Sequence, residues 1–189
     1  QSELRKILHA ATHTVVVIDE AYAEFSDFSV LRWIRKYPQL FVVRTFSKAA
    51  GLAGLRLGAV LACAESLSLL RRVMPPFPVS VAALVAAEAA VNDRRTMHRY
   101  VVAVRRLRAC LERELRKLSV KTYPSAGNFL LADFGPQGPA LFQRLDRQGI
   151  LLRARSREFA PGFVRITIGT EAEMQKLLKA IRKEWKSPA

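Results

Sequence analysis

The sequence has few cysteines, few acidic residues and no long hydrophobic run. Its 189 residues include two cysteines, Cys63 and Cys110, which lack C-x-x-C spacing. We expect both to be buried free thiols rather than a disulfide or a metal site. No apolar run approaches the roughly 18 residues that span a bilayer, and the first residues contain no secretory hydrophobic region. These absences predict a cytoplasmic protein without a membrane span.

Basic residues outnumber acidic ones, at 31 against 16, and the formal net charge is +15. Such an excess can serve binding to a nucleic acid or another anionic surface. In segment 94–117, however, apolar residues recur at helical spacing, so the arginines fall mainly on the outer face of an amphipathic helix. The apolar positions are Met97, Tyr100, Val101, Val104, Leu107, Leu111, Leu115 and Leu118. Because aromatic interleaving and nucleic-acid motifs are absent, we interpret the charge as a solvated face, which can also attract phosphorylated molecules electrostatically.

The pattern of apolar residues predicts an α/β protein. Strands are predicted at 14–18, 40–44 and 57–62, and then at 121–124, 128–133, 150–152 and 163–168. Helices are predicted at 67–73, 80–91, 94–117 and 138–148. A last helix follows the capping box formed by Thr170 and Glu173, with an apolar face at Met174, Leu177, Leu178 and Ile181.

Lys48 lies in a loop whose composition suits a carbonyl cofactor that carries a phosphate. A lysine amine attacks carbonyls when burial or a nearby cation activates it, and Arg44 and Arg56 are the candidate cations. Arg56 can also grip a phosphate through two hydrogen bonds, while Thr45 and Ser47 offer hydroxyl donors. The loop is Arg44-Thr45-Phe46-Ser47-Lys48-Ala49-Ala50-Gly51-Leu52-Ala53-Gly54-Leu55-Arg56-Leu57-Gly58.

A second candidate site element is the carboxylate that follows the first predicted strand. Asp19 comes directly after Val15-Val16-Val17-Ile18 and is followed by Glu20-Ala21-Tyr22. Open α/β sheets bind ligands at the carboxyl ends of their strands. Asp19 is therefore placed where a ligand is expected.

Together these motifs resemble those of the fold-type I pyridoxal-phosphate aminotransferases, and most closely the histidinol-phosphate aminotransferases. The segments that match are Ile18–Tyr22, Ser47-Lys48, Gly54–Gly58, Pro75–Ser80, Ala126–Phe129 and Arg165–Thr170. The resemblance runs from about residue 14 to the end of the chain. It implies a transaminase that uses pyridoxal 5'-phosphate, with L-histidinol phosphate and 2-oxoglutarate as substrates, and a homodimer in the full-length parent.

Members of that family are roughly twice as long, so the resemblance implies that this chain is a C-terminal portion whose activity alone is doubtful. Residues 1–78 would form the back half of a large, mostly parallel sheet domain. Residues 79–118 would be connecting helices, and residues 119–189 a small α/β domain.

The resemblance also implies roles for individual residues. Lys48 would form the Schiff base with the cofactor and move the substrate proton. Asp19 would pair with the protonated pyridine nitrogen, and Tyr22 would hydrogen-bond the phenolic oxygen. Ser47 and Arg56 would hold the phosphate, with Thr45 beside them. In the second half, Arg165 would bind a substrate carboxylate and Arg153 a substrate phosphate, with Asn128 nearby.

Ordinary structural roles are the alternatives for these residues. Asp19 could cap the end of a strand, Tyr22 could be a packed aromatic, and Arg56 could pair with a carboxylate. Arg165 could be the polar alternate of a half-buried strand. Arg153 could be a solvated residue, as Arg155 and Arg157 could be.

Three further alternatives concern the kind of protein. His9 and His13 have a spacing that can hold a metal, but a third ligand is not evident, so no metal site is expected. An O-phospho-amino-acid decarboxylase of the same architecture would use the same lysine and a phosphate-binding arginine. A non-catalytic basic binding module would need neither.

Overall fold

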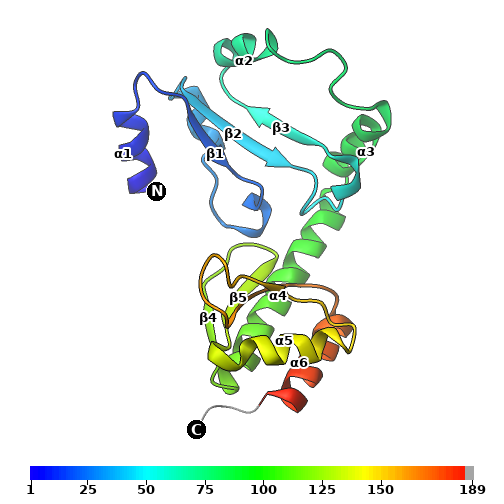
Figure 1. Cartoon of the computed structure of the whole chain (residues 1–189). Coiled ribbons are helices and arrows are strands. Elements are labelled where there is room, and N and C mark those ends of the chain that lie inside the picture. Colours follow the sequence, from blue (N-terminus) through cyan, green and yellow to red (C-terminus); the bar gives the residue numbers. More distant parts are fainter. Residues whose placement is uncertain (186–189) are drawn as a thin grey trace. The chain divides into compact units, whose positions relative to one another are not determined.

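The computed structural model describes residues 1–185, which form two compact units (Figure 1). The first unit is Gln1–His98, and the second begins at Arg99. The division lies within helix α4 (Arg94–Lys117), which contributes residues to both units. The domain limits at residues 78 and 118 remain predictions, and each unit is described by itself below.

The first unit contains a three-stranded sheet in the order β1-β2-β3. Strands β1 (Val16–Asp19) and β2 (Leu40–Thr45) run parallel, and β3 (Gly58–Leu61) is antiparallel to β2. All three strands predicted for this half are confirmed. Within residues 1–185 this sheet is mixed, with one parallel and one antiparallel pair, so a mostly parallel character is not visible in it.

Three helices and three short 3-10 segments accompany this sheet. The helices are α1 (Ser2–Ala10), α2 (Ala64–Arg71) and α3 (Val81–Asn92), and the 3-10 segments are η1 (Ala23–Phe25), η2 (Leu31–Arg35) and η3 (Ala53–Leu55). Helix α3 is confirmed, and its N-cap Ser80 accepts a hydrogen bond from the Ala83 amide at 3.2 Å. Helix α2 begins at Ala64, three residues before the predicted start, and the Leu67 amide donates to the carbonyl of the N-cap Cys63 at 3.0 Å.

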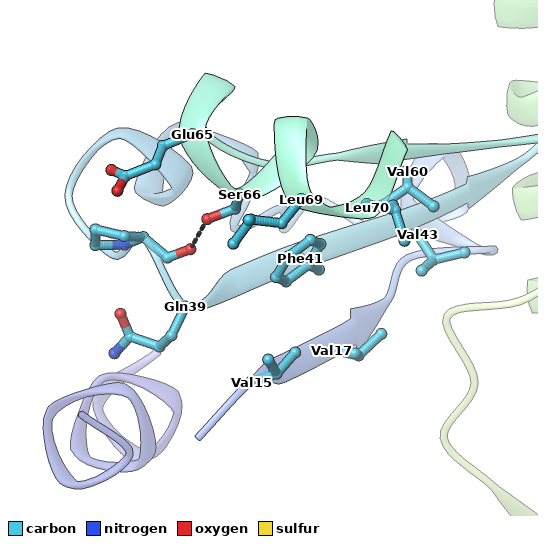
Figure 2. A pocket seen from close by; sticks show the side chains of 11 residues that line it. Val15, Val17, Gln39, Phe41, Val43, Val60, Glu65, Ser66, Leu69 and Leu70 are labelled. Carbon is cyan, nitrogen blue, oxygen red and sulfur yellow. Dashed lines mark hydrogen bonds between the residues drawn. The ribbon is translucent and has the colours of Figure 1, made fainter. Parts of the chain in front are cut away.

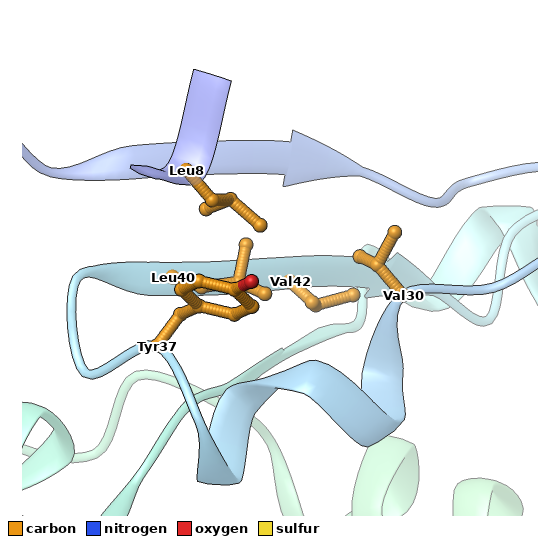
Figure 3. Packing of buried hydrophobic residues seen from close by; sticks show 5 residues of the cluster. All are labelled: Leu8, Val30, Tyr37, Leu40 and Val42. Atoms are coloured by element: carbon orange, nitrogen blue, oxygen red, sulfur yellow. The ribbon is translucent and has the colours of Figure 1, made fainter. Parts of the chain in front are cut away.

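One face of the sheet carries the core of the first unit. Leu40 and Val42 of β2 are fully buried there, and Leu8 of α1 packs against them (Figure 3). Val30 and Tyr37, which lie on either side of η2, close the cluster. The strands alternate, so every second residue of β1 and β2 lies on the opposite face.

The second unit contains a four-stranded antiparallel sheet in the order β4-β5-β7-β6. Its strands are β4 (Lys121–Tyr123), β5 (Phe129–Asp133), β6 (Arg153–Ala154) and β7 (Phe163–Thr167), and its helices after α4 are α5 (Gly138–Asp146) and α6 (Glu171–Glu184). Leu130 and Ile166 of the sheet are buried, as are Leu141 of α5 and Ile181 of α6. The capping box of Thr170 and Glu173 is confirmed, as is the buried apolar face predicted for α6.

Helix α4 has the amphipathic arrangement that the sequence predicts. Its buried residues are Val101, Val104, Leu107, Leu111 and Leu115, and most of its arginines are exposed. Tyr100, predicted to face the core, is 39% exposed. Two ion pairs join α4 to α6, from Arg106 to Glu171 at 2.7 Å and from Arg182 to Glu114 at 2.6 Å. Part of the basic face is thus neutralised by carboxylates of the same chain. None of the helices within residues 1–185 is long and apolar enough to cross a membrane.

The strand predicted at 150–152 is wrong. Helix α5 ends in a turn at Gly149, whose φ is +70°, and the Ile150 amide donates to the Leu145 carbonyl at 3.0 Å. The turn lies at 147–149 and engages only Ile150 of the predicted strand, while strand pairing begins at Arg153 and lasts two residues.

The two cysteines are free, as predicted, but the expectation that both are buried is wrong. Each is only half-buried. Cys63 occupies the N-cap of α2 at the surface, where its sulfur lies 3.2 Å from the Ser66 hydroxyl. Cys110 lies on the flank of α4, 3.5 Å from the Arg113 guanidinium.

Candidate functional site

The carboxyl ends of β1 and β2 bring three of the predicted site residues to one edge of the sheet. Because the two strands are parallel, Asp19 at the end of β1 lies beside Val43 of β2, shortly before the Lys48 loop. The Lys48 amine lies 5.5 Å from the centroid of the Tyr22 ring, over its face. That distance is within the range of a cation–π contact. Lys48 and the segment after Asp19 are therefore close together in the fold.

Asp19 is exposed at this edge, with one carboxylate oxygen engaged by the backbone. Its Oδ1 accepts a hydrogen bond from the Ala21 amide at 2.8 Å. This bond turns the chain away from β1 toward Tyr22 and fixes the orientation of the carboxylate. Asp19 thus ends the strand and also presents a negative charge beside it.

Several hydrogen bonds hold the loop that carries Lys48. The Ser47 amide donates to the Thr45 hydroxyl at 3.1 Å, and that hydroxyl donates to the Leu57 carbonyl at 3.4 Å. Gly51, at φ +71°, lets the chain turn so that its amide donates to the Lys48 carbonyl at 3.2 Å. The Thr45 hydroxyl therefore serves the loop itself.

Apolar contacts also hold the residues that flank this loop. Leu57 is buried together with Ala83 and Ala87 of α3, and Phe46 packs against this cluster. Phe46 and Leu57 flank the hydrogen-bonded part of the loop, and the Phe46 amide donates to the Leu57 carbonyl at 3.1 Å. Lys48 is thus attached to a rigid base, which favours a fixed position of its amine.

Arg44, one of the two candidate cations for activating Lys48, is engaged by carboxylates, so its effect on the lysine stays a prediction. Its guanidinium donates from Nη2 and Nε to Oε2 of Glu20, at 2.8 and 3.1 Å. Glu20 is only 7% exposed and also accepts from the Ser29 hydroxyl and the Val30 amide, at 2.8 and 2.6 Å. A second carboxylate, Glu24, lies 3.8 Å from Arg44.

The partnership of Glu20 and Arg44 was missed at the level of sequence. The two residues are 24 positions apart in the sequence. Glu20 directly follows β1, and Arg44 lies near the end of β2. A weak signal was present, because Glu20 directly follows an apolar strand and a carboxylate there needs a partner if it is buried. The ion pair ties the ends of β1 and β2 together just where Asp19 and the Lys48 loop begin.

Arg56 has an unusual backbone conformation at the far end of the loop. Its φ of +52° lies in the left-handed region, which costs a non-glycine residue roughly 1 to 2 kcal/mol. One guanidinium nitrogen, Nη1, donates to the Ala53 carbonyl at 2.9 Å, and the residue is exposed. The other N–H groups of the planar guanidinium have a fixed geometry that suits paired hydrogen bonds to a phosphate or a carboxylate.

In the second unit, Arg153 and Arg165 lie directly opposite each other on β6 and β7. The Arg165 guanidinium lies 5.4 Å from the centroid of the Phe129 ring. Its Nε is buried and lacks a hydrogen-bond partner among the described residues. Asn128 contributes its carbonyl to the sheet, where it accepts from the Ile168 amide at 2.8 Å. The predicted residues of this half thus include a pair of neighbouring cations.

The predicted site residues therefore form one group in each unit. Residues 1–185 hold no cluster of three or more histidine, cysteine, aspartate or glutamate side chains that could bind a metal. His9, which was weighed as a ligand, lies 3.1 Å from the Tyr37 hydroxyl instead.

Comparison with known families gives one match that covers most of the chain. Residues 1–181 match the family described as aminotransferase class I and II. Histidinol-phosphate aminotransferase of Anaeromyxobacter sp. is 40% identical over 189 residues, which is 96% of this chain and 51% of that protein. Histidinol-phosphate aminotransferase 2 of Pseudomonas fluorescens is 40% identical over 179 residues, 90% of this chain and 47% of that protein. The chain thus spans about half the length of these relatives.

Two solved structures resemble the fold closely. The histidinol-phosphate aminotransferase of Sinorhizobium meliloti in complex with pyridoxal-5'-phosphate has a TM-score of 0.82 at 27% identity, covering 95% of this chain and 53% of that one. The L-threonine-O-3-phosphate decarboxylase of Porphyromonas gingivalis has a TM-score of 0.82 at 25% identity, covering 96% and 58%. Both proteins share the α/β architecture described above.

Proposed function

Because this chain belongs to the class I and II aminotransferase family, we propose that it supplies the lysine-bearing portion of a transaminase that uses pyridoxal 5'-phosphate. Its substrates would be L-histidinol phosphate and 2-oxoglutarate. The observation that carries the proposal is the position of the Lys48 amine, 5.5 Å over the Tyr22 ring at the sheet edge where Asp19 ends β1. The 40% identity with histidinol-phosphate aminotransferases supports the choice of substrate.

The side chains at this edge suit that cofactor chemically. The cofactor combines an aldehyde, a basic ring nitrogen, a phenolic oxygen and a phosphate, and when bound it would draw electrons away from the substrate carbon. Asp19 offers an exposed carboxylate for a protonated ring nitrogen. Tyr22 offers a hydroxyl for the phenolic oxygen, and Arg56 offers an exposed guanidinium for the phosphate.

Each residue would act through an ordinary property of its side chain. The Lys48 amine would attach the cofactor covalently and, once released, carry a proton as a general base and acid. The Asp19 carboxylate would keep the ring nitrogen protonated by pairing with it. Ser47 would donate to a phosphate oxygen, together with Arg56. The Thr45 hydroxyl would keep Ser47 in place through the 3.1 Å bond from the Ser47 amide.

Arg165 and Arg153 would recognise the anionic parts of the substrates. A guanidinium binds a carboxylate or a phosphate through two parallel hydrogen bonds. The buried Nε of Arg165 supports its assignment to the carboxylate of glutamate or 2-oxoglutarate, because an anion would satisfy this donor. Arg153, which is exposed, is assigned to the substrate phosphate, and Asn128 is a further substrate-binding candidate. A cytoplasmic homodimer is proposed for the full-length enzyme.

Cofactor trapping tests the proposal directly. The purified chain is mixed with pyridoxal 5'-phosphate, reduced with borohydride, and digested for peptide mass spectrometry. We expect labelling at Lys48 alone, and its loss in Lys48→Arg, which keeps the charge. Lys36→Arg is the matched control, because Lys36 lies over the Tyr37 ring at a similar distance of 5.6 Å but away from Asp19. Labelling spread over many lysines would contradict the proposal.

A decarboxylase is the second candidate function. The observation in its favour is the similarity of the fold, at a TM-score of 0.82, to the L-threonine-O-3-phosphate decarboxylase of Porphyromonas gingivalis. Product analysis separates the two reactions. A transaminase yields a keto product together with glutamate, whereas a decarboxylase releases carbon dioxide.

A further inference from the structure

Arg108 of α4 reaches across to the loop that precedes β5. Its Nη1 donates a hydrogen bond to the Gly127 carbonyl. We propose that Arg108 is a positioning residue for Arg165. It acts through the contacts that join Gly127 to the Phe129 ring and that ring to the Arg165 guanidinium. The proposal rests on the proposed function, in which Arg165 binds the carboxylate of glutamate or 2-oxoglutarate.

The groove of the first unit is poorly suited to a carboxylate. It lies between α2 and the strands, encloses about 610 Å³, and is lined mainly by apolar side chains such as Phe41, Val43 and Leu69 (Figure 2). Glu65 is the one charged side chain among the described residues that line it. A negative charge in an apolar groove disfavours anions. A dicarboxylate is therefore better matched by the arginines of the second unit.

The pairing of β5 with β7 places Phe129 and Arg165 on the same face of the sheet. Arg165 lies directly opposite Leu131, and Phe129 comes two residues before Leu131 on the same strand. Side chains alternate along a strand, so Phe129 is a diagonal neighbour of Arg165. Such neighbours are within reach of an aromatic ring and a long side chain. The Arg165 guanidinium accordingly lies 5.4 Å from the centroid of the Phe129 ring.

This ring supports the guanidinium and leaves its N–H groups available. An aromatic face attracts a cation without accepting a conventional hydrogen bond from it. The Arg165 Nε is buried and lacks a hydrogen-bond partner among the described residues. Arg153, directly opposite, repels the guanidinium because it carries the same charge. The Phe129 ring therefore orients Arg165 before an anion binds.

Gly127 is the point at which the loop meets this ring. The ring packs so closely that a Cβ added at Gly127 would lie 2.6 Å from Cε1 of Phe129. The Gly127 amide donates to the Ser125 hydroxyl at 3.1 Å. The next residue, Asn128, is tied to the sheet, because its carbonyl accepts from the Ile168 amide at 2.8 Å. A shift of Gly127 against this fixed strand would therefore change the space left for the ring.

Arg108 fixes Gly127 from a rigid helix. The neighbouring residues Leu107 and Leu111 are buried, which anchors this part of α4. Arg108 itself is half-buried, and burial lowers the pKa of its guanidinium, with nearby Arg105 as the second cause. A cation partly withdrawn from water loses free energy if its hydrogen bonds are not made. The bond to the Gly127 carbonyl is thus stronger than one at the open surface.

Arginine modification tests the proposal without substrate. The purified chain is treated with phenylglyoxal, which reacts with accessible guanidinium groups, and the rate at each arginine is read by peptide mass spectrometry. Arg108→Gln should raise the rate at Arg165 by about threefold to tenfold, the equivalent of one hydrogen bond. Gly127→Ala should raise it as well, because the added methyl group displaces the Phe129 ring. The φ of Gly127 is not positive, so alanine fits its backbone.

Three controls separate positioning from general loosening. Arg108→Lys keeps a charged donor and should restore most of the unaltered rate. Arg116→Gln removes an exposed pair with Glu112 on the same helix and should change nothing. Arg144 of α5 is the internal reference in every sample, because its pair with Glu184 is independent of the loop.

Two results would overturn the proposal. One is an unchanged rate at Arg165 in both Arg108→Gln and Gly127→Ala. The other is an equal rise at Arg165 and Arg144, which would indicate partial unfolding. Protection of Arg165 by 2-oxoglutarate is measured separately in the unaltered chain. Its absence would contradict the carboxylate-binding role under the proposed function, and not the positioning by Arg108.

Discussion

Arg153 and Arg165 face each other across β6 and β7, in direct register on antiparallel strands. Like charges at such positions destabilise a sheet by up to about 1 kcal/mol. The two arginines face each other although β6 is only two residues long and pairs with β7 at two positions. A bound anion between the two guanidinium groups would remove this cost.

We therefore expect phosphate to stabilise the chain through these two arginines. At low ionic strength, millimolar phosphate should raise the thermal midpoint, because the ligand binds the folded state only. Arg153→Gln should melt slightly higher than the unaltered chain without phosphate and should gain less when it is added. Differential scanning fluorimetry with phosphate, and with chloride at equal ionic strength, provides the measurement. Arg157→Gln is the control, because Arg157 is exposed and outside β6. An equal phosphate shift in both variants would contradict the prediction.

A single buried ion pair is predicted to hold the site edge together. Glu20→Gln leaves Arg44 without its main partner and weakens four hydrogen bonds to a carboxylate that is only 7% exposed. Breaking a buried pair costs about 3 to 5 kcal/mol, and since Arg44 is 29% exposed we expect about 2 kcal/mol. Urea denaturation measures the loss.

The control for this ion pair is Glu3→Gln. Glu3 pairs with Lys6 at 2.9 Å, but both side chains are about three-quarters exposed, at 77% and 74%. Its loss should cost less than about 0.5 kcal/mol, because water screens exposed pairs. Equal effects of the two substitutions would show that Glu20 is not a structural anchor.

The sequence predicts most of this fold where a local pattern determines the structure. The apolar runs place β1, β2 and β3, and the capping box places the start of α6. The resemblance implies one site for Asp19 and Lys48, and the parallel pairing of β1 and β2 places Asp19 beside Val43, shortly before the Lys48 loop. The roles proposed for these two side chains in binding the cofactor remain predictions.

Features that depend on distant residues could not be read from the sequence. One wrong prediction was local, because the turn at 147–149 and the bond from the Ile150 amide to the Leu145 carbonyl delay strand pairing until Arg153. The partner of Arg44 is set by the register of two strands, which no local pattern encodes. The half-exposed position of Cys63 follows from the start of α2.

Cys63 is predicted to react as a thiolate at lower pH than an ordinary cysteine. The pKa of the Cys63 thiol is lowered mainly by its hydrogen bond with the Ser66 side chain. A hydrogen bond with the Ser66 backbone amide is the second cause, and both stabilise the thiolate. In a Cys110→Ser background, the rate of iodoacetamide alkylation against pH gives the apparent pKa. Ser66→Ala should move this pKa upward, toward the ordinary value. Ser68→Ala, on the same helix, should leave it unchanged. A pKa that is insensitive to Ser66→Ala would contradict the assignment.

The capping box of α6 is predicted to lose its stabilising effect in acid. The Thr170 backbone amide donates to the Glu173 carboxylate at 2.6 Å, and the Thr170 hydroxyl donates to it at 2.8 Å. Both bonds lower the pKa of the Glu173 carboxyl group, and the bond from the Thr170 amide has the larger effect. A carboxyl group whose pKa is lower in the folded state stabilises the fold above its unfolded pKa. That stabilisation is lost as the pH falls from the ordinary glutamate range through the folded pKa.

Urea denaturation at pH 7 and at pH 3 separates this effect from general acid sensitivity. Glu173→Gln should reduce the free energy of unfolding at pH 7 and make a smaller difference at pH 3, because the stabilisation by the carboxylate declines as the pH falls toward its lowered folded pKa. Thr170→Ala should cost about 1 kcal/mol at pH 7, the usual cost of losing an N-cap. Glu171→Gln is the control for charge in the first turn of the helix, because Glu171 lies outside the capping box and its ion pair with Arg106 is exposed and contributes little. If Glu173→Gln and Glu171→Gln gave the same dependence on pH, the helix dipole rather than the capping box would account for the acid loss.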